Sequence, residues 1–219
     1  MNVTLLSYTQ NATNLCATAA KACYSAKEIA TLWAEVDDKS SGATIAKTVG
    51  MGHQSVIEHA TYTFALDAVS RSLTHQLVRH RIASFSQQSQ RYVNLEKPSY
   101  VIPEEIRNDR DMVEIFEKCM LTCWDSYNVL VRTGAKNEDA RGCLPNACTT
   151  NIVVSMNARE LMHFFTLRTC NRAQTEIREV AKLMLAECKR VSPEIFAVAG
   201  PACFRGVCPE GKLSCKREI

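Results

Sequence analysis

The alternation of apolar and polar residues along the chain predicts both strands and helices. Residues 3–8 suit a short strand, and residues 61–68 repeat with the period of two that marks a strand with one buried face. The buried positions of this second strand are expected to be Tyr62, Phe64, Leu66 and Ala68. Residues 149–155 are also β-like, so the chain has the segments needed for a sheet.

Helical spacing covers a larger part of the chain, and we expect helices over residues 11–24, 45–51, 71–79, 109–133, 157–168 and 174–191. The clearest of these helices, 109–133, has one apolar stripe, formed by Met112, Phe116, Cys119, Cys123, Tyr127 and Leu130. Gly134 suits the end of this helix. The stretch rich in serine and glutamine that follows Arg81 is expected to be a loop or an extended segment.

The order of these elements indicates the fold class. Strands and helices are mixed without regular βαβ alternation, which favours an α+β fold over a doubly wound parallel sheet. We therefore predict an antiparallel sheet packed with helices and no Rossmann fold. No internal repeat, linker or low-complexity segment interrupts the sequence, so residues 1–219 are expected to form one domain with a cysteine-containing tail at about 200–219.

The composition narrows the class of protein. Hydrophobic residues make up 46% of the 219 residues and charged residues 22%, as in an ordinary globular enzyme. The net charge of +3 is low for a general nucleic-acid binder, so we expect no nucleic-acid partner. No apolar run is long enough to span a membrane, and the N-terminal residues lack the basic end and apolar stretch of a signal peptide. We therefore expect a cytoplasmic protein without a membrane partner.

The eleven cysteines fit a reducing compartment, in which they are expected to be free thiols and not a disulfide framework. Most lie in helical patterns and are expected to be small core residues, namely Cys16, Cys23, Cys119, Cys123 and Cys188. Cys203, Cys208 and Cys215 stand close together in the tail. A metal site is the alternative there, but the tail has no CxxC pair and no fourth ligand, so we predict no metal.

The segment from Arg79 to Tyr92 has the most distinctive chemistry of the chain. It includes three arginines, a histidine, three serines and three glutamines, and no acid stands between Ala68 and Leu95. The planar donor fork of arginine matches phosphate geometry. Interleaved apolar residues such as Ile82 indicate partial burial, and a partly buried arginine needs a partner. The segment is therefore expected to be a phosphate pocket, with a solvated basic loop as the alternative.

Several common catalytic and phosphate-binding motifs are absent from the chain. Its eight glycines build neither GxGxxG nor a Walker loop, so side chains must hold the phosphates of any dinucleotide. His53 and His59 are six residues apart and do not form an HExxH metal motif. Ser89 has His80 nearby in sequence, but the segment lacks an orienting acid and GxSxG is absent. We therefore expect Ser89 to be a hydroxyl that positions the ligand.

Four ordered blocks resemble the signature of the flavin-dependent thymidylate synthases. The segment Gly52–His59 is similar to the family's GHxSxxEH block. The triplet Arg79–Arg81 is followed by a serine eight residues later and by an arginine two residues further on. Asn157-Ala158-Arg159 and the downstream Arg168 resemble the third and fourth blocks, the two parts of the family's NxR…R pattern. The blocks lie in the family's order, and the resemblance spans most of residues 50–180.

This resemblance implies an enzyme that converts dUMP to dTMP. It implies that methylenetetrahydrofolate donates the carbon, that NADPH is the reductant, and that FAD, bound without a Rossmann fold, carries the redox step. It also implies a homotetramer in which each active site is shared between subunits. The route of methylene transfer and the choice between NADPH and NADH stay open.

The resemblance extends to individual residues of two binding sites. It implies that the cofactor is held by Ser55, Arg79, His80, Arg81, Gln87, Asn157, Arg159 and His163. It implies that the nucleotide is held by Gln76, Arg79, Gln87, Ser89, Gln90, Arg91, Arg141 and Arg168. Arg168 matches the family arginine that stabilises the ionised pyrimidine ring, and its own charge is permanent at neutral pH. Ser89 is the second catalytic candidate.

Two positions depart from the family pattern, and two other functions remain as alternatives. Gln87 stands where some members carry Glu, and Arg172 stands where some carry His, so a proton-transfer role cannot be carried over to Arg172. The nearer alternative function is another flavin enzyme that acts on a nucleotide. The other is an arginine-rich module that binds single-stranded nucleic acid through the segment Arg79–Arg81 and Tyr92.

Overall fold

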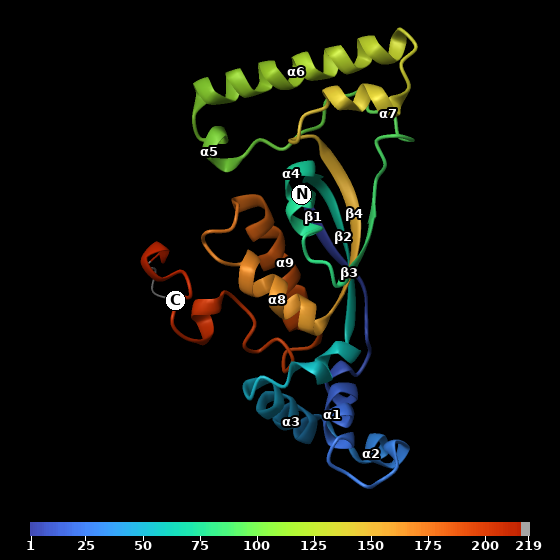
Figure 1. Ribbon diagram of the computed structural model, residues 1–219, viewed down its shortest axis with the longest axis vertical. Coiled ribbons are helices and arrows are strands. Elements are labelled where there is room, and N and C mark those ends of the chain that lie inside the picture. The colour runs from blue at the N-terminus through green and yellow to red at the C-terminus, as the bar shows by residue number, and fades with distance from the viewer. Residues whose placement is uncertain (216–219) are drawn as a thin grey trace. The chain divides into compact units, whose positions relative to one another are not determined.

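The computed structural model describes residues 1–215 and contains a four-stranded sheet (Figure 1). The strands stand in the order β1 (Asn2–Tyr8), β2 (Thr61–Ser70), β4 (Thr149–Asn157) and β3 (Ala83–Gln87). The hydroxyl oxygens of Thr63 and Ser155 lie 2.8 Å apart, and Asn151 Oδ1 accepts a hydrogen bond from Ala68 N. Residue numbers therefore rise along β2 as they fall along β4, which confirms the antiparallel sheet and the α+β class.

Helices connect and flank these strands. The α-helices are α1 (Ala12–Ala22), α2 (Ile29–Glu35), α3 (Asp38–Gly50), α4 (Arg71–Leu77), α5 (Glu104–Arg107), α6 (Arg110–Arg132), α7 (Asn137–Ala140), α8 (Ala158–Arg168) and α9 (Thr175–Val191). Shorter 3-10 helices are η1 (Gln54–His59), η2 (Arg141–Cys143), η3 (Ala202–Arg205) and η4 (Gly211–Leu213). Each predicted helix is present, although α3 begins earlier than expected because Asp37 caps it by accepting the N–H of Ser40.

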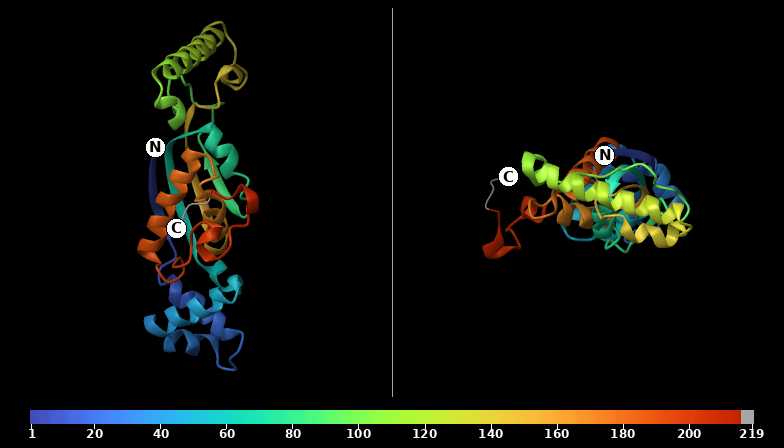
Figure 2. Two further views of the ribbon diagram at one scale, coloured as in Figure 1. Left: turned by 90° about the vertical axis from the view of Figure 1, so that its left-hand side faces the viewer. Right: turned by 90° about the horizontal axis from the view of Figure 1, so that it is seen from above.

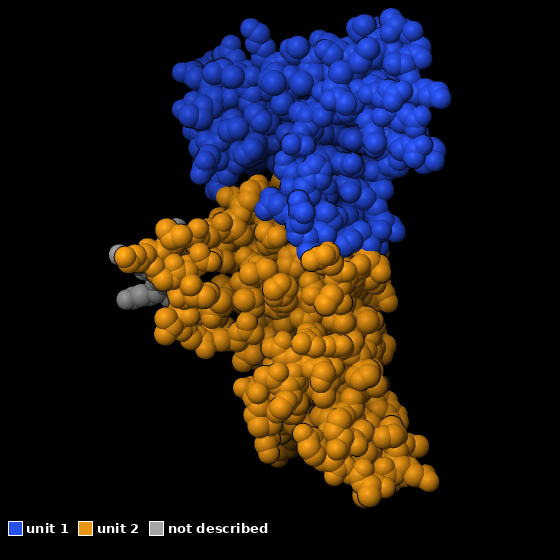
Figure 3. All heavy atoms as spheres, in the orientation of Figure 1, with its two compact units in different colours: residues 1–2, 65–79, 85–153 blue, residues 3–64, 80–84, 154–219 orange. Residues whose placement is uncertain are grey.

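The residues form two compact units (Figure 3). Unit 1 contains Met1–Asn2, Ala65–Arg79 and Phe85–Val153. Unit 2 contains Val3–Phe64, His80–Ser84 and the described residues from Val154 onward. Each of the four strands has residues in both units, so the two units do not have separate sheets.

The core of unit 2 includes α8 and α9, which lie side by side in Figure 1 and in the left view of Figure 2. Tyr62 on β2 is fully buried and donates its hydroxyl proton to Ser192 Oγ at 2.7 Å, just after α9 ends. The Tyr62 ring also meets Phe196 edge-on, with the ring centroids 5.3 Å apart. Phe165 of α8 packs on Phe196 in the same way, so α8 and the segment after α9 share one apolar core.

Unit 1 contains α6, whose buried face differs from the predicted stripe. Met120, Trp124 and Tyr127 are its buried residues, whereas Met112 is 52% exposed and Cys119 and Leu130 are also exposed. Trp124 Nε1 donates a hydrogen bond to the carbonyl of Leu95, 2.9 Å away. The predicted stripe was therefore wrong in part, because the apolar arc of α6 is wider than the face that the rest of unit 1 covers.

The end of β2 also departs from the prediction. Tyr62, Phe64 and Leu66 are buried as expected, but Ala68 is exposed and has a φ of 53°, in the left-handed region. This local change of conformation interrupts the period of two, and the next residue, Val69, is buried. The following residue, Ser70, then caps α4 by accepting the N–H of Leu73 at 3.0 Å. The local kink is therefore followed at once by α4, which precedes the segment from Arg79 to Tyr92.

The cysteines are only partly core residues. All eleven are free thiols; Cys16 and Cys188 are buried as predicted, while Cys23 and Cys119 are exposed, contrary to the prediction. In the described part of the chain, no three residues of the types His, Cys, Asp and Glu lie together as they would around a metal ion. Over the same residues, no helix has the length and apolarity that crossing a membrane would require.

Candidate active site

The predicted site residues divide between the two units. Unit 1 contains the residues expected to hold the nucleotide, except Arg168, together with two residues also expected at the cofactor, Arg79 and Gln87. Unit 2 contains Arg168 and the remaining residues expected at the cofactor: Ser55, His80, Arg81, Asn157, Arg159 and His163.

The arginines of the segment from Arg79 to Tyr92 are less buried than the sequence suggested. Arg79, Arg81 and Arg91 are all exposed, and the interleaved apolar residues Ile82 and Tyr92 are 68% and 81% exposed. The prediction of partial burial was therefore wrong for Ile82 and Tyr92 and for these arginines, whereas the interleaved Ala83 and Phe85 are partly buried as expected. Part of the stretch is the strand β3, in which alternate side chains face opposite sides, so Ser84 and Ser86 are exposed.

In unit 1, two arginines contact Glu138, one at its carboxylate and one at its backbone carbonyl, and a third arginine lies near one of them. Glu138 Oε2 accepts hydrogen bonds from Arg91 Nε at 2.9 Å and lies 2.8 Å from Arg91 Nη2. Arg141 donates from Nε to the backbone carbonyl of Glu138, 3.1 Å away. Arg71 is half-buried, and burial lowers its pKa, with the nearby charge of Arg141 acting in the same direction. Arg71, Arg91 and Arg141 are three cations, and only Arg91 is shown paired with a carboxylate, that of Glu138. This arrangement favours an anionic ligand such as a phosphate.

The side chains of Gln87 and Ser89 form hydrogen bonds inside unit 1. Gln87 Nε2 donates to the hydroxyls of Thr74 at 3.1 Å and Thr150 at 3.3 Å. Ser89 Oγ accepts the backbone N–H of Arg91 at 3.2 Å. Among the described residues, no hydrogen bond joins Ser89 to a histidine or a carboxylate. This geometry is typical of a hydroxyl that orients a ligand and not of an activated nucleophile.

Two unit 1 residues near these side chains had not been predicted as site residues. Arg71 Nη1 donates to the carbonyl of Gln88 at 3.4 Å, and Gln90 Nε2 lies 3.5 Å from Cys148 Sγ. Burial raises the pKa of the Cys148 thiol, so it is neutral. The absence of acids around Arg71 was visible in the sequence, but Cys148 has no local signal because its neighbour Gln90 is 58 residues away.

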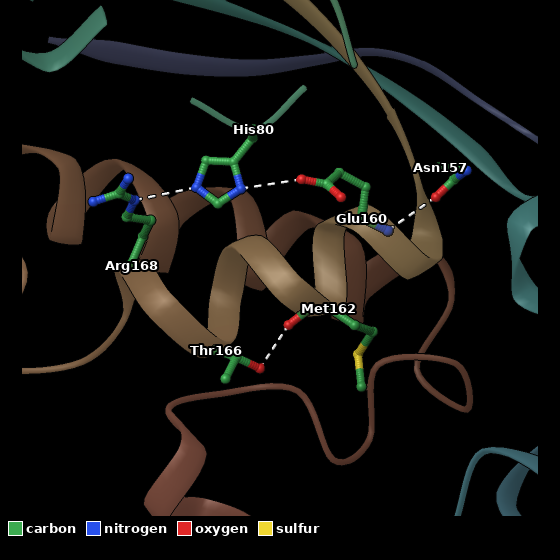
Figure 4. Close-up of polar contacts among 6 residues, drawn as sticks. All are labelled: His80, Asn157, Glu160, Met162, Thr166 and Arg168. Carbon is green, nitrogen blue, oxygen red and sulfur yellow. Dashed lines mark hydrogen bonds and ion pairs between the residues drawn. The ribbon is translucent and has the colours of Figure 1, made fainter. Parts of the chain in front are cut away.

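His80, in unit 2, connects two other side chains through its ring nitrogens (Figure 4). Its Nδ1 lies 3.1 Å from Glu160 Oε1, and its Nε2 accepts a hydrogen bond from Arg168 Nε at 3.1 Å. Arginine Nε always carries a proton, so Nε2 must be the acceptor and the proton must lie on Nδ1. His80 is therefore neutral and donates to Glu160.

The surroundings of His80 favour this neutral state. The ring is only 4% exposed and meets the Phe164 ring edge-on at 5.0 Å. Burial, followed by the charges of Arg168 and His163, lowers the pKa of His80 to about 4. Both ring nitrogens already have partners within the protein, so the expectation that His80 holds the cofactor stays a prediction.

Glu160 is a site residue that the sequence prediction missed. It is buried, and burial raises the pKa of its carboxyl group. Its backbone N–H is bound by Asn157 Oδ1 at 2.9 Å, so Asn157 is the N-cap of α8. The sequence N-x-x-E resembles a capping box and indicates that Glu160 lies in the first turn. It gives no indication that the carboxylate contacts a histidine 80 residues earlier in the chain.

The other residues predicted at the cofactor are polar groups on the surface of unit 2. Ser55, Arg81, Arg159 and His163 are exposed. Arg159 forms an ion pair with Glu58 of the GHxSxxEH-like block, which brings two of the predicted blocks together. Ser55 lies inside η1, whose N-cap is His53.

The C-terminal tail contacts the loop that follows Arg168. Arg172 Nη1 donates to the carbonyl of Leu213 at 3.0 Å, and its Nε lies 3.3 Å from Glu210 Oε2. Asn171 Nδ2 lies 3.5 Å from Cys215 Sγ. Arg172, where some family members carry His, therefore has a structural partner in the tail.

This geometry defines a class of protein, an α+β protein in which arginine side chains, and no glycine-rich loop, present positive charge to an anionic ligand. The family model described as "Thymidylate synthase complementing protein" matches residues 4–194, and the chain belongs to this family. The family was thus correctly indicated by the four ordered sequence blocks.

Individual relatives agree with this assignment over nearly the whole chain. The flavin-dependent thymidylate synthase of Geobacter sulfurreducens is 46% identical over 217 residues, which cover 98% of this chain and 94% of that protein. The flavin-dependent thymidylate synthase of Pyrococcus furiosus is 42% identical over 222 residues, which cover 97% of this chain and 91% of that protein. The resemblance to the flavin-dependent thymidylate synthases is therefore confirmed, and the two alternative functions are set aside.

A solved structure supports the fold. The crystal structure of a UMP/dUMP methylase from Streptomyces cacaoi, bound with 5-Br dUMP, matches with a TM-score of 0.80. The match covers 94% of this chain and 96% of that chain at 23% sequence identity. The two proteins therefore have the same fold.

Proposed function

We propose that this flavin-dependent thymidylate synthase converts dUMP to dTMP, with methylenetetrahydrofolate as carbon donor and NADPH as reductant through FAD. The free thiols of all eleven cysteines agree with a cytoplasmic location for this reaction. The protein acts on the nucleotide as a methyltransferase and needs no nucleic-acid partner.

The observation that supports this function best is the placement of Arg168. The pyrimidine must become nucleophilic at its carbon five, so negative charge on the ring has to be stabilised. Arg168 is half-buried and is held through Nε by the neutral His80. A fixed, permanently charged donor in a partly desolvated place stabilises developing negative charge better than a mobile one in water.

The nucleotide-binding residues have the chemistry that dUMP requires. We propose that Arg91 and Arg141, with Arg79, bind the phosphate, since the Glu138 carboxylate pairs with Arg91 whereas Arg141 contacts only the backbone carbonyl of Glu138. Gln76, Gln87, Ser89 and Gln90 supply neutral hydrogen-bonding groups for the sugar and the base. Ser89 orients the pyrimidine, because no base is in contact with its hydroxyl among the described residues.

The unit 2 residues fit FAD by their donor set. Ser55, Arg81, Arg159 and His163 are exposed polar groups, and two of the four are arginines that can pair with a diphosphate. We propose that these residues hold FAD together with Asn157, His80, Arg79 and Gln87. When bound, FAD supplies the reducing equivalents of the reaction, and the protein supplies orientation and charge.

We predict that the purified protein carries FAD or takes it up noncovalently. Titration of the apoprotein with FAD should quench the flavin fluorescence, and the loaded protein should form dTMP from dUMP, methylenetetrahydrofolate and NADPH. A colourless protein whose addition leaves flavin fluorescence unchanged contradicts the proposed function. NADH in place of NADPH in the same assay determines the preferred reductant.

We propose that the enzyme is a homotetramer with shared active sites. One side of α6 is apolar and uncovered: Met112 is 52% exposed and Ile115 71% exposed, and Leu130 lies on the same side. Light scattering at micromolar concentration should give four times the 24.4 kDa mass of the chain. Ile115→Glu should lower this mass, whereas Leu121→Glu, on the opposite side of α6, should not. The monomer mass with intact activity would refute the tetramer.

A further inference from the structure

Glu160 has no role in the residue matches given above, although among the described residues it is the one acid that is buried. The side chains of Glu160 and His80 are 8% and 3% exposed. Burial of a carboxylate is costly unless it is paired or hydrogen-bonded. The family match assigns His80 and Arg168 but leaves the acid that joins this pair without a function.

Helix capping does not explain the position of the Glu160 carboxylate. In a capping box this side chain would turn back to the N-cap residue, Asn157. Here Asn157 caps α8 with its own side chain, and the carboxylate contacts His80 Nδ1 (Figure 4). The first turn of a helix favours negative charge, so α8 tolerates the acid at this place.

The contact with Glu160 decides what His80 can offer to Arg168. Because Glu160 accepts the Nδ1 proton, the ring adopts the tautomer whose Nε2 is an acceptor. In the other tautomer, Nε2–H would face the Nε–H of Arg168, and two donors would oppose each other. A hydrogen bond at Nε fixes the plane of the guanidinium group, and the other four N–H groups of arginine belong to Nη1 and Nη2.

We propose that Glu160 and His80 are positioning residues, which together hold the Arg168 guanidinium in the orientation needed to stabilise charge on the pyrimidine. The use of this orientation rests on the proposed function, whereas the hydrogen-bonded chain itself is a property of the fold. Glu160 acts through His80 and has no contact of its own with the substrate. Its loss should therefore matter only while Arg168 is present.

A double-mutant cycle tests this dependence. Glu160→Gln should lower kcat about tenfold, the order expected from loss of a charge-assisted hydrogen bond, and leave KM for dUMP and FAD content within about twofold. In an Arg168→Ala background the same change should have almost no further effect on kcat, because the two residues act as one unit. Glu187→Gln, which removes a partly exposed acid paired with Arg190 on α9, is the matched control and should leave kcat unchanged.

Independent effects in the cycle overturn the proposal. If Glu160→Gln lowers kcat by the same factor with and without Arg168, Glu160 acts on the enzyme by another route. An unchanged kcat for Glu160→Gln alone also overturns it. The thermal unfolding temperature and the FAD content of each variant serve as folding controls. A general loss of folding would lower both quantities together.

The tautomer of His80 is a second measurement that needs neither activity nor a variant at Glu160. Nitrogen NMR of protein labelled at its five histidines, with His80→Gln to assign the signal, should show a neutral ring protonated on Nδ1. The charged or titratable groups known to face this ring are Glu160, Arg168 and His163, and the ring should stay neutral on acidification until about pH 4. A ring protonated on Nε2 at neutral pH overturns the proposed positioning.

The two tests separate failure of this inference from failure of the proposed function. An Nε2-protonated ring in an enzyme that forms dTMP refutes only the positioning role. An Nδ1-protonated ring in a protein that forms no dTMP refutes the proposed reaction and leaves the hydrogen-bonded chain intact. The positioning role is supported if three results occur together: His80 is protonated on Nδ1, the enzyme forms dTMP, and the effects of Glu160→Gln and Arg168→Ala on kcat are not additive.

Discussion

Replacement of Arg168 by alanine is expected to lower turnover by about tenfold to a hundredfold, while the protein still takes up FAD. The loss of one hydrogen bond to a charged group costs about 1.5–3 kcal/mol, which corresponds to this range of rates. The effect should fall on kcat more than on flavin affinity, because the proposed partner of Arg168 is charge that develops on the pyrimidine.

Two further variants sharpen this prediction. Arg168→Lys keeps the positive charge but loses the planar fork and the Nε contact with His80, so it should recover only part of the turnover. Arg190→Ala, an exposed arginine paired with Glu187 on α9, should keep both turnover and flavin binding. Unchanged turnover with weakened flavin binding in Arg168→Ala would reverse the assignment and place this residue at the cofactor.

Replacement of Phe164 by alanine is expected to lower the free energy of unfolding by about 3–5 kcal/mol, the usual cost of removing a buried aromatic ring. Phe164 is fully buried on α8 and meets the rings of His80 and Phe165 edge-on, at 5.0 Å and 5.6 Å. The surrounding side chains belong to packed elements and can close the resulting cavity only in part.

The measurement for Phe164→Ala is denaturant unfolding of the apoprotein, followed by circular dichroism and compared with Leu167→Ala. Leu167 lies on the same helix but is 46% exposed, so its loss should change the free energy of unfolding by less than about 1 kcal/mol. Equal losses for the two variants would show that the core of unit 2 does not depend on Phe164. Because the Phe164 ring also packs on His80, the variant should lose turnover as well.

The pH dependence of stability has a definite sign at His80. Its pKa in the folded protein is about 4, below the ordinary histidine value, so the unfolded chain binds the proton more readily. The contribution of His80 to stability is therefore fully present above the unfolded-state value and is lost as the pH falls toward 4. The raised pKa of buried Glu160 acts in the opposite direction and offsets part of this loss.

The sequence by itself determined the fold class, most element positions and the family. The spacing of apolar residues predicted β2 and located α6 as residues 109–133, against the observed Arg110–Arg132. These features are local, because the period of a helix or strand is set by its own backbone geometry. The four ordered blocks that indicated the family are local features too. Each is a short run of residues, and its order and spacing can be identified directly in the sequence.

Only the tertiary structure decided which face of α6 is buried, where β2 leaves its regular period, and what contacts Arg168. The covered face of α6 depends on Leu95 and its neighbours, which the helix spacing does not contain. His80 lies 80 residues before Glu160 and 88 before Arg168, so no local pattern could show that one ring joins them. Hydrogen bonds between distant residues exist only after packing has brought those residues together, and packing also removes the water that would otherwise compete for them.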